Sequence, residues 1–158
     1  MILRTGKRSA FTLVEMLVVL AIMAMLMGVS LPFTSGFGKG LKIKTTARAI
    51  LGTLRLARSN AITHRGEYSV IFDASSGEYW IEDPEGGILE KKYRITSAIK
   101  FKIPDDENAD PITFEGDKVV FYPTGGAKGS TGSITISDKR GQSRVISIIT
   151  GTGKITIE

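Results

Sequence analysis

The stretch that decides the fold lies near the start of the chain, in residues 7–33, which read KRSAFTLVEMLVVLAIMAMLMGVSLPF. Residues 11–31 contain one charged side chain, Glu15. As an α-helix these 21 residues would be about 31 Å long, which matches the hydrocarbon core of a bilayer. The sequence therefore predicts a membrane-spanning helix at this end of the chain.

The flanks of the apolar stretch predict its orientation. Three of the chain's 21 bases, Arg4, Lys7 and Arg8, precede it, so the net charge of +5 owes much to this short leader. Basic flanks stay in the cytoplasm, which places the remaining chain outside the cytoplasm. A secretory signal peptide has a shorter apolar region followed by a small-residue cleavage site, and this stretch shows neither. Topology alone thus favours an uncleaved anchor.

Glu15 does not fit a simple anchor. A charge at the centre of a membrane helix costs roughly 2.5–3.5 kcal/mol on insertion scales, which makes such a residue a functional candidate. Because Glu15 lies four residues from Phe11, the alternative is that its side chain reaches the headgroups at the membrane surface.

Residues 9–26, SAFTLVEMLVVLAIMAML, resemble the class III signal of type IV pilins and type II secretion pseudopilins. In that family a basic leader ends in a small residue, and F-T-L-x-E and an apolar helix follow. The resemblance implies cleavage between Ala10 and Phe11 by a prepilin peptidase at the cytoplasmic face, then methylation of the new Phe11 amine. Ala10 departs from the family, where glycine is usual, so we expect slower processing at worst.

The resemblance also implies a role for Glu15. Cleavage turns the Phe11 amide nitrogen into an ammonium, and opposite charges attract strongly where the dielectric is low. Glu15 would pair with the Phe11 amine of a neighbouring subunit, which favours the assembly of processed subunits and sets their register. The implied partners are other pilin or pseudopilin subunits, the prepilin peptidase, the inner-membrane assembly platform and membrane lipids.

A second helix is predicted after the span. Pro32 removes a backbone donor, so we expect a helix break there. Apolar residues then recur at alternating steps of four and three from Ile43 to Ala61, which predicts an amphipathic helix within residues 34–66, capped by Gly66.

Residues 39–65 contain seven bases and no acid. On a helix, five of them fall within an arc of about 100° beside the apolar stripe: Lys44, Arg48, Arg55, Arg58 and Arg65. We expect this flank to pair with acids of neighbouring elements or subunits. The alternative is a surface for nucleic acid or lipid headgroups.

From residue 67 onward the pattern is typical of short strands. Residues 67–73 and 78–83 flank a turn and predict a hairpin, and a second hairpin turns at residues 139–141. Further strands are expected over 99–103, 118–122 and 153–158. The predicted fold is α+β, with a long N-terminal hydrophobic helix packed on an antiparallel sheet. The chain is expected to divide into a leader (1–10), a transmembrane helix (11–33), an amphipathic segment (34–66) and a β domain (67–158).

Two later segments resemble the GspH/FimT group of minor pseudopilins: residues 54–66, LRLARSNAITHRG, and the glycine-rich tail, residues 119–157. The resemblance implies a structural subunit of a type II secretion pseudopilus or a type IV pilus that acts in filament initiation, assembly and protein secretion. It would be a single-pass protein of the bacterial inner membrane, with the C-terminal domain outside the cytoplasm. Roughly residues 75–115 show no pattern of that group.

No catalytic residue, cofactor or metal site is predicted, and we do not expect an enzyme. The chain has no cysteine, and its one histidine, His64, suits the end of a helix. The glycine-rich PTGGAKGSTG lacks the G-K-[ST] ending of a phosphate loop. The acids of residues 105–110 do not have EF-hand spacing, so a solvated loop is favoured over a calcium site.

The alternative function is a FimT-like minor pilin that binds DNA for natural transformation. Its phosphate contacts would come from Lys139, Arg140, Arg144 and Lys154. The FimT-type branch carries G-R-x-R in its tail, whereas this chain has G-K-I-T from Gly153 to Thr156, so DNA binding is not favoured.

Overall fold

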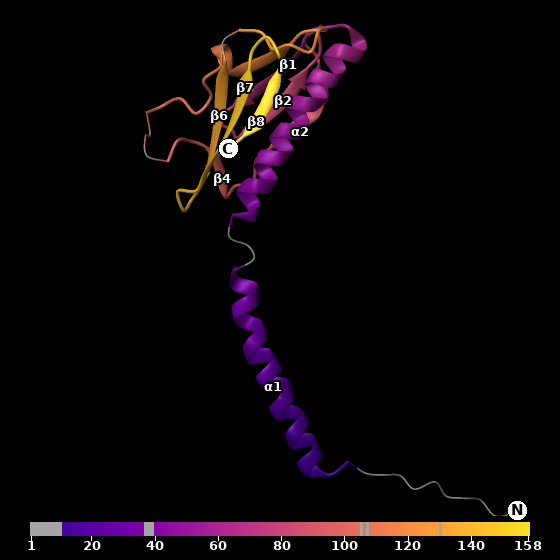
Figure 1. The fold of residues 1–158 in the computed structure, drawn as a ribbon, viewed down its shortest axis with the longest axis vertical. Helices are drawn as coiled ribbons and strands as arrows, with labels where there is room; N and C mark the ends of the chain where they lie inside the picture. Colours follow the sequence, from indigo (N-terminus) through magenta and orange to yellow (C-terminus); the bar gives the residue numbers. More distant parts are fainter. Residues whose placement is uncertain (1–10, 37–39, 105, 107, 130) are drawn as a thin grey trace, which may run out of the picture. The chain divides into compact units, whose positions relative to one another are not determined.

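The computed structural model of the chain describes residues 11–36, 40–104, 106, 108–129 and 131–158, with side chains left out for residues 29–36. The chain forms two compact units, Met1–Lys39 and Gly40–Glu158. Helix α1 belongs to the first unit, and helix α2 with all the strands belongs to the second (Figure 1).

Helix α1 spans Leu13–Gly36 and begins at a capping threonine. The Thr12 hydroxyl accepts a hydrogen bond from the Glu15 amide at 3.2 Å, and the Thr12 carbonyl accepts one from the Met16 amide at 3.2 Å. The T-x-x-E spacing from Thr12 to Glu15 is that of a capping box, which places the helix start two residues after Phe11. Within the described part of the chain, none of the helices combines the length and the hydrophobicity that a membrane span requires.

The break predicted at Pro32 is wrong, because α1 continues through this residue and ends at Gly36. Proline deprives a helix of one backbone hydrogen bond, and the helix can adjust locally around it while the other bonds of a long apolar helix remain. The proline at position 32 therefore does not mark the end of this helix.

Helix α2 spans Leu41–His64. Its buried positions include the whole predicted apolar stripe: Ile43, Ala47, Ile50, Leu54, Ala57 and Ala61. The predicted cap is one residue off, because Arg65 and not Gly66 adopts the left-handed conformation, with φ of 53°. Gly66 serves a different purpose, since a Cβ there would lie 2.6 Å from Cγ of Pro84 in the β2–β3 turn.

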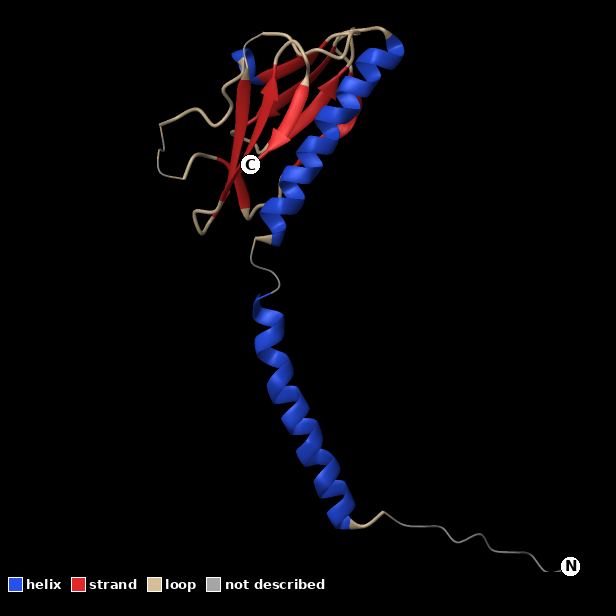
Figure 2. Cartoon of the chain, in the orientation of Figure 1, coloured by secondary structure: helices blue, strands red, loops and turns tan. Residues whose placement is uncertain are grey.

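The strands form two four-stranded antiparallel sheets (Figure 2). The first has the order β3-β2-β1-β5, with bounds Ile88–Arg94, Glu78–Glu82, Tyr68–Asp73 and Lys118–Phe121. The second has the order β4-β6-β7-β8, with bounds Ile99–Phe101, Gly132–Asp138, Ser143–Ile149 and Lys154–Ile157. A short 3-10 helix, Glu115–Asp117, precedes β5.

The α+β class and both predicted hairpins are confirmed by the pairings Asp73↔Glu78 and Ser137↔Ser143. The division into two sheets was not predicted, and neither was β3. This edge strand is mostly exposed and carries several charged side chains, so it lacks the alternation that identifies a half-buried strand.

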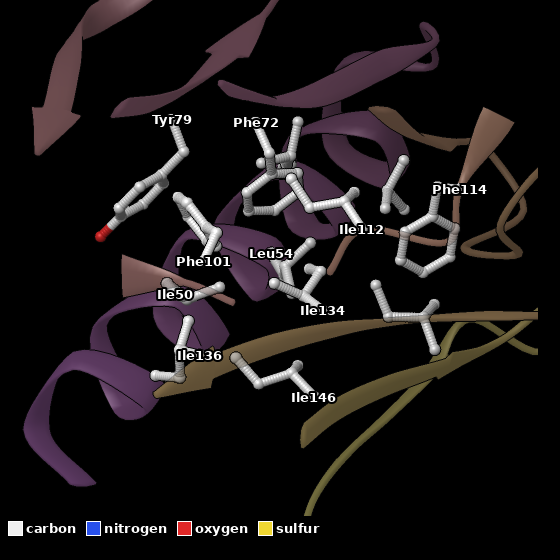
Figure 3. Close-up of a cluster of buried hydrophobic side chains, with 14 of the residues drawn as sticks. Ile50, Leu54, Phe72, Tyr79, Phe101, Ile112, Phe114, Ile134, Ile136 and Ile146 are labelled. Carbon is white, nitrogen blue, oxygen red and sulfur yellow. The ribbon is translucent and has the colours of Figure 1, made fainter. Parts of the chain in front are cut away.

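The core lies between α2 and the two sheets (Figure 3). Ile50 and Leu54 of α2 are fully buried against side chains of both sheets, among them Phe72, Ile134 and Ile146. The buried hydrophobic residues of the described chain run from Ile43 to Ile148. Residues 40–158 therefore contain a complete core and form a unit able to fold by itself.

Candidate functional site

The first candidate site is the segment before and within the first turn of α1. Phe11 is 71% exposed and lies outside the helix, and Glu15 is exposed in the first turn of the helix. The Glu15 amide is used by the Thr12 cap, but its carboxylate makes no hydrogen bond or ion pair within the described part of the chain. Ala10 lies outside the described residues. The segment thus presents a carboxylate at a helix N-terminus, where negative charge is favourable.

A second feature was not found from sequence: Arg58 joins helix α2 to two distant loops. Its Nε donates to the Gly125 carbonyl at 2.7 Å and its Nη2 donates to the Thr152 carbonyl at 3.1 Å. The two loops also meet directly, since the Gly151 amide donates to the Ala127 carbonyl at 3.3 Å. One half-buried guanidinium therefore holds the β5–β6 loop and the β7–β8 turn against the helix.

Glycines allow this close approach. A Cβ on Gly126 would overlap the Gly151 carbonyl oxygen, and a Cβ on Gly153 would overlap the Gly125 carbonyl oxygen. The glycines of the β5–β6 loop and of the β7–β8 turn thus bring two backbones into contact. The A-R-S motif of residues 57–59 and the glycines of the tail were signals of this contact, but neither pattern alone shows that they meet.

The four candidate DNA contacts are not brought together. Lys139 and Arg140 lie in the β6–β7 turn, and Arg144 is paired with Ile136 near that turn. Lys154 is paired with Ile149 at the opposite end of β7, five residues from Arg144, or about 17 Å along the strand.

Lys154 instead lies near Arg55 and Arg58. Together with Thr152, Gly153 and Ile155, these three bases line a hollow of about 240 Å³. Both Arg55 and Lys154 are exposed, whereas Arg58 is held by its two carbonyl partners. The hollow offers positive charge to an anionic group.

Several carboxylates close turns in the described chain. Asp73 Oδ1 accepts hydrogen bonds from the Ser75 hydroxyl at 2.6 Å and from the Ser75 and Ser76 amides at 2.9 and 3.1 Å. Hydrogen bonds from Ser75 and Ser76 hold the pKa of Asp73 well below its usual range.

In the acidic loop, Asp106 accepts from the amides of Asn108 and Ala109, and Asp110 accepts from the amide of Ile112. Asp105 and Glu107 lie outside the described residues. Among the residues that are described, no group of three or more His, Cys, Asp and Glu side chains is placed to hold a metal ion. The visible role of the Asp106 and Asp110 carboxylates is to close turns of this loop.

Comparison with protein families gives two matches. The model of the Type II transport protein GspH matches residues 46–153, and the Prokaryotic N-terminal methylation motif matches residues 5–31. Comparison with curated proteins gives no match.

Solved structures with the same fold include two kinds of filament subunit. The minor pseudopilin EpsH from the Type 2 Secretion System of Vibrio cholerae is 12% identical, with a TM-score of 0.55 over 74% of this chain and 96% of that chain. The type IV minor pilin FimU of Pseudomonas aeruginosa strain PAO1 is 20% identical, with a TM-score of 0.58 over 77% of this chain and 92% of that chain. At these identities the likeness shows the fold.

The two family matches together cover the methylation motif and most of the second unit. Members of this family are structural pilin and pseudopilin subunits, which are membrane-anchored and assemble with other such subunits. Because the family model spans more than half of the sequence, the chain belongs to the GspH family of type II transport proteins.

Proposed function

We propose that the chain is a GspH-like minor pseudopilin built into a type II secretion pseudopilus or a type IV pilus, where it acts in filament initiation, assembly and protein secretion. The observation that carries this proposal is the Glu15 carboxylate, which has no partner within the described chain and stands one turn after Phe11 in a methylation motif. A structural subunit is also what the family match supports.

Processing comes first in this proposal. A prepilin peptidase at the cytoplasmic face cuts between Ala10 and Phe11, and the new Phe11 amine is methylated. The geometry supports such a cut, because Phe11 and Thr12 precede the first helical turn and Phe11 is exposed. A peptidase therefore need not unwind α1 to reach the bond on the N-terminal side of Phe11.

Assembly follows from the charge that processing creates. An unpaired Glu15 in an apolar setting is costly, and the ammonium of a neighbouring subunit's Phe11 would remove much of that cost. An unprocessed subunit has an uncharged amide at the same position. Assembly is thus restricted to processed subunits, and the pair fixes how far one helix is displaced along the next.

The apolar N-terminal segment anchors the subunit before assembly. In residues 11–31 Glu15 is the one charged side chain, and three bases precede it. We therefore place the N-terminus in the cytoplasm, a single pass through the inner membrane, and residues 40–158 outside the cytoplasm. The assembly platform and membrane lipids are the partners of the anchored form.

The test is the intact mass of the full chain extracted from membranes of cells with and without an active prepilin peptidase. We expect a mature form that starts at Phe11 and carries one added methyl group in the first sample and the uncut chain in the second. The Ala10→Gly variant should be cut faster. An uncut chain in both samples, for the natural sequence and for Ala10→Gly alike, would overturn the proposal in favour of a simple anchor.

A further inference from the structure

Strand β8 forms an edge of the second sheet, where it pairs with β7. Val145 of β7 and Glu158 exchange two backbone hydrogen bonds, of 3.1 and 2.9 Å. Hydrogen-bonded and non-hydrogen-bonded pairs alternate along an antiparallel ladder, so the amides and carbonyls of Ile155 and Ile157 point away from β7. These groups have no strand partner among the residues that the structure describes. The edge therefore offers backbone donors and acceptors to an added strand.

The other sheet edges carry features that discourage an added strand. The pairing of β3 with β2 is irregular, and β3 exposes two lysines. The β5 edge is covered, because the Lys128 amide donates to the Val120 carbonyl at 2.8 Å. Strand β4 has three residues. Irregularity, charge, cover and shortness are common protections of an edge, whereas β8 pairs regularly over its whole length and has no proline.

The apolar face of the second sheet is incompletely covered at β8. Ile155 and Ile157 lie opposite Ile148 and Ile146 of β7, so all four side chains share the face that packs on the core. The two β7 side chains are fully buried, but those of Ile155 and Ile157 are partly buried. A further strand at this edge would bury more of both side chains.

Three bases surround a hollow of about 240 Å³ between β8 and helix α2, which lie side by side (Figure 1). The hollow is lined by Lys154 and Ile155 of β8 and by Arg55 and Arg58 of α2. Arg58 is fixed by its two carbonyl partners, whereas Arg55 and Lys154 are exposed. A segment that pairs with β8 therefore meets positive charge at the start of the strand.

More bases continue along the same flank of α2. Lys44, Arg48 and Arg55, here called the basic strip, lie within about 40° of one another around the helix. All three are exposed and make no hydrogen bond or ion pair within the described part of the chain. A Cβ on Gly40, at the start of α2, would lie 3.2 Å from Oε1 of Gln142, just before β7. Strand β8 thus runs back along α2 from the hollow toward Lys44.

We propose that β8 accepts an extended, acid-bearing segment of a different filament subunit as an additional strand of the second sheet. The main chain of the segment pairs with Ile155 and Ile157. Alternate side chains of a strand share one face, so its carboxylates lie on the face next to the hollow and the basic strip. The inference rests on the proposed function and names the chemistry by which a neighbouring subunit is recognised.

This chain does not itself supply a suitable segment. Residues 1–10 contain three bases and no acid. Residues 67–90 contain seven acids and no base, but they belong to the first sheet and its turns. A minor subunit is surrounded mainly by subunits of other kinds. The acid-bearing segment is therefore assigned to one of those subunits.

The test uses residues 40–158 and a peptide of about ten residues that alternates threonine and glutamate. Binding should slow hydrogen exchange of the Ile155 and Ile157 amides, followed by NMR, roughly tenfold when about nine-tenths of the protein is bound. The effect should weaken at high salt, because the charges are exposed. Two control peptides should give no protection. One has glutamine in place of glutamate, and the other has an N-methylated backbone that cannot donate hydrogen bonds.

Variants of the protein separate charge from backbone pairing. We expect Arg55→Glu to lose peptide binding, whereas the matched control Lys100→Glu, on β4 at the other edge of the same sheet, should bind as the natural sequence does. Ile157→Pro removes an amide that points away from β7 and should also lose binding. Urea unfolding checks that this variant is folded, and the N-methylated peptide tests the same pairing without changing the protein.

The proposal is wrong if the two amides stay unprotected, if either control peptide protects them, or if Lys100→Glu loses binding as Arg55→Glu does. Protection of the same amides by self-association, without peptide, would assign the edge to a second copy. Duplex DNA that binds through Arg55 and leaves the amides unprotected, while the peptide does not bind, would assign the bases to nucleic acid. The mass measurement of processing is independent. A chain that is cut and methylated but fails the exchange test refutes this inference and leaves the proposed function in place.

Discussion

The contact between the two glycine-rich loops yields a prediction with built-in controls. Gly153, Gly151 and Gly126 all lie where the loops meet, but they differ in what a side chain would disturb. Gly153 has a φ of 62° and no room for a Cβ beside the Gly125 carbonyl oxygen. Gly151 has a φ of 79° and nothing within 4 Å of a Cβ. A Cβ on Gly126 would overlap the Gly151 carbonyl oxygen, but the φ of Gly126 is not in the left-handed region.

Substitution by alanine separates the cost of a left-handed backbone from the cost of a crowded Cβ. A left-handed backbone costs an ordinary residue roughly 1–2 kcal/mol, so Gly151→Ala should lose about that much stability. Forcing a Cβ into a closely packed site costs roughly 1–3 kcal/mol, which is the loss expected for Gly126→Ala. Gly153→Ala carries both costs and should lose roughly 2–5 kcal/mol. Any shift of the Gly125 carbonyl would also weaken its bond from Arg58.

Urea unfolding of residues 40–158 measures these differences, with the single tryptophan, Trp80 on β2, as the fluorescent probe. The informative quantity is the difference in the free energy of unfolding between Gly153→Ala and Gly151→Ala. Both variants carry the backbone cost, so this difference isolates the cost of the crowded Cβ. If the two variants unfold at the same urea concentration with equal slopes, the loops do not touch as described and the reasoning is refuted.

Three further predictions follow from single side chains. Glu15→Gln should be cut and methylated normally but should enter filaments poorly, which the mass measurement and a sheared-filament assay would separate; normal entry would remove the proposed role of the charge. Arg58→Lys should destabilise residues 40–158 by roughly 1–3 kcal/mol in urea unfolding, because an ammonium does not replace a guanidinium bound to two carbonyls, whereas Arg55→Lys should have almost no effect. Because the pKa of Asp73 is lower in the folded chain than its ordinary value of 3.8, the stability it contributes is present above that pH and is lost as the pH falls below it. The natural sequence and Asp73→Ala should therefore differ at neutral pH and converge in acid, and NMR titration of the Asp73 carboxyl checks the pKa directly.

Features that depend on neighbours in sequence were predicted well. The apolar run, the spacing from Ile43 to Ala61 and the two hairpins are local patterns, and the structure confirms the helix and both hairpins. The F-T-L-V-E motif that begins at Phe11 needed no tertiary information either, and the methylation-motif match agrees with it.

Two predictions were wrong where the intrinsic preference of one residue competes with other interactions of similar energy. Pro32 disfavours a helix, but it removes a single hydrogen bond from a helix of 24 residues, and the helix continues. Gly66 suits a left-handed cap, yet Arg65 takes that conformation and Gly66 is needed for its contact with Pro84. The intrinsic preference of each residue favours one conformation, whereas its surroundings in the fold decide which one it adopts.

The sequence by itself determined the N-terminal methylation motif, the helical stripe that faces the core, most of the strands and the segregation of bases and acids into successive segments. Tertiary structure alone decided that the strands form two sheets, that Arg58 joins loops far from it in the chain, and that Lys154 lies beside Arg55 and far from Arg144. The physical reason is that local patterns and tertiary contacts act over different distances along the chain. Side-chain periodicity reports which face of one element is buried, but contacts between elements depend on how the whole core packs, and no short stretch of sequence records that packing.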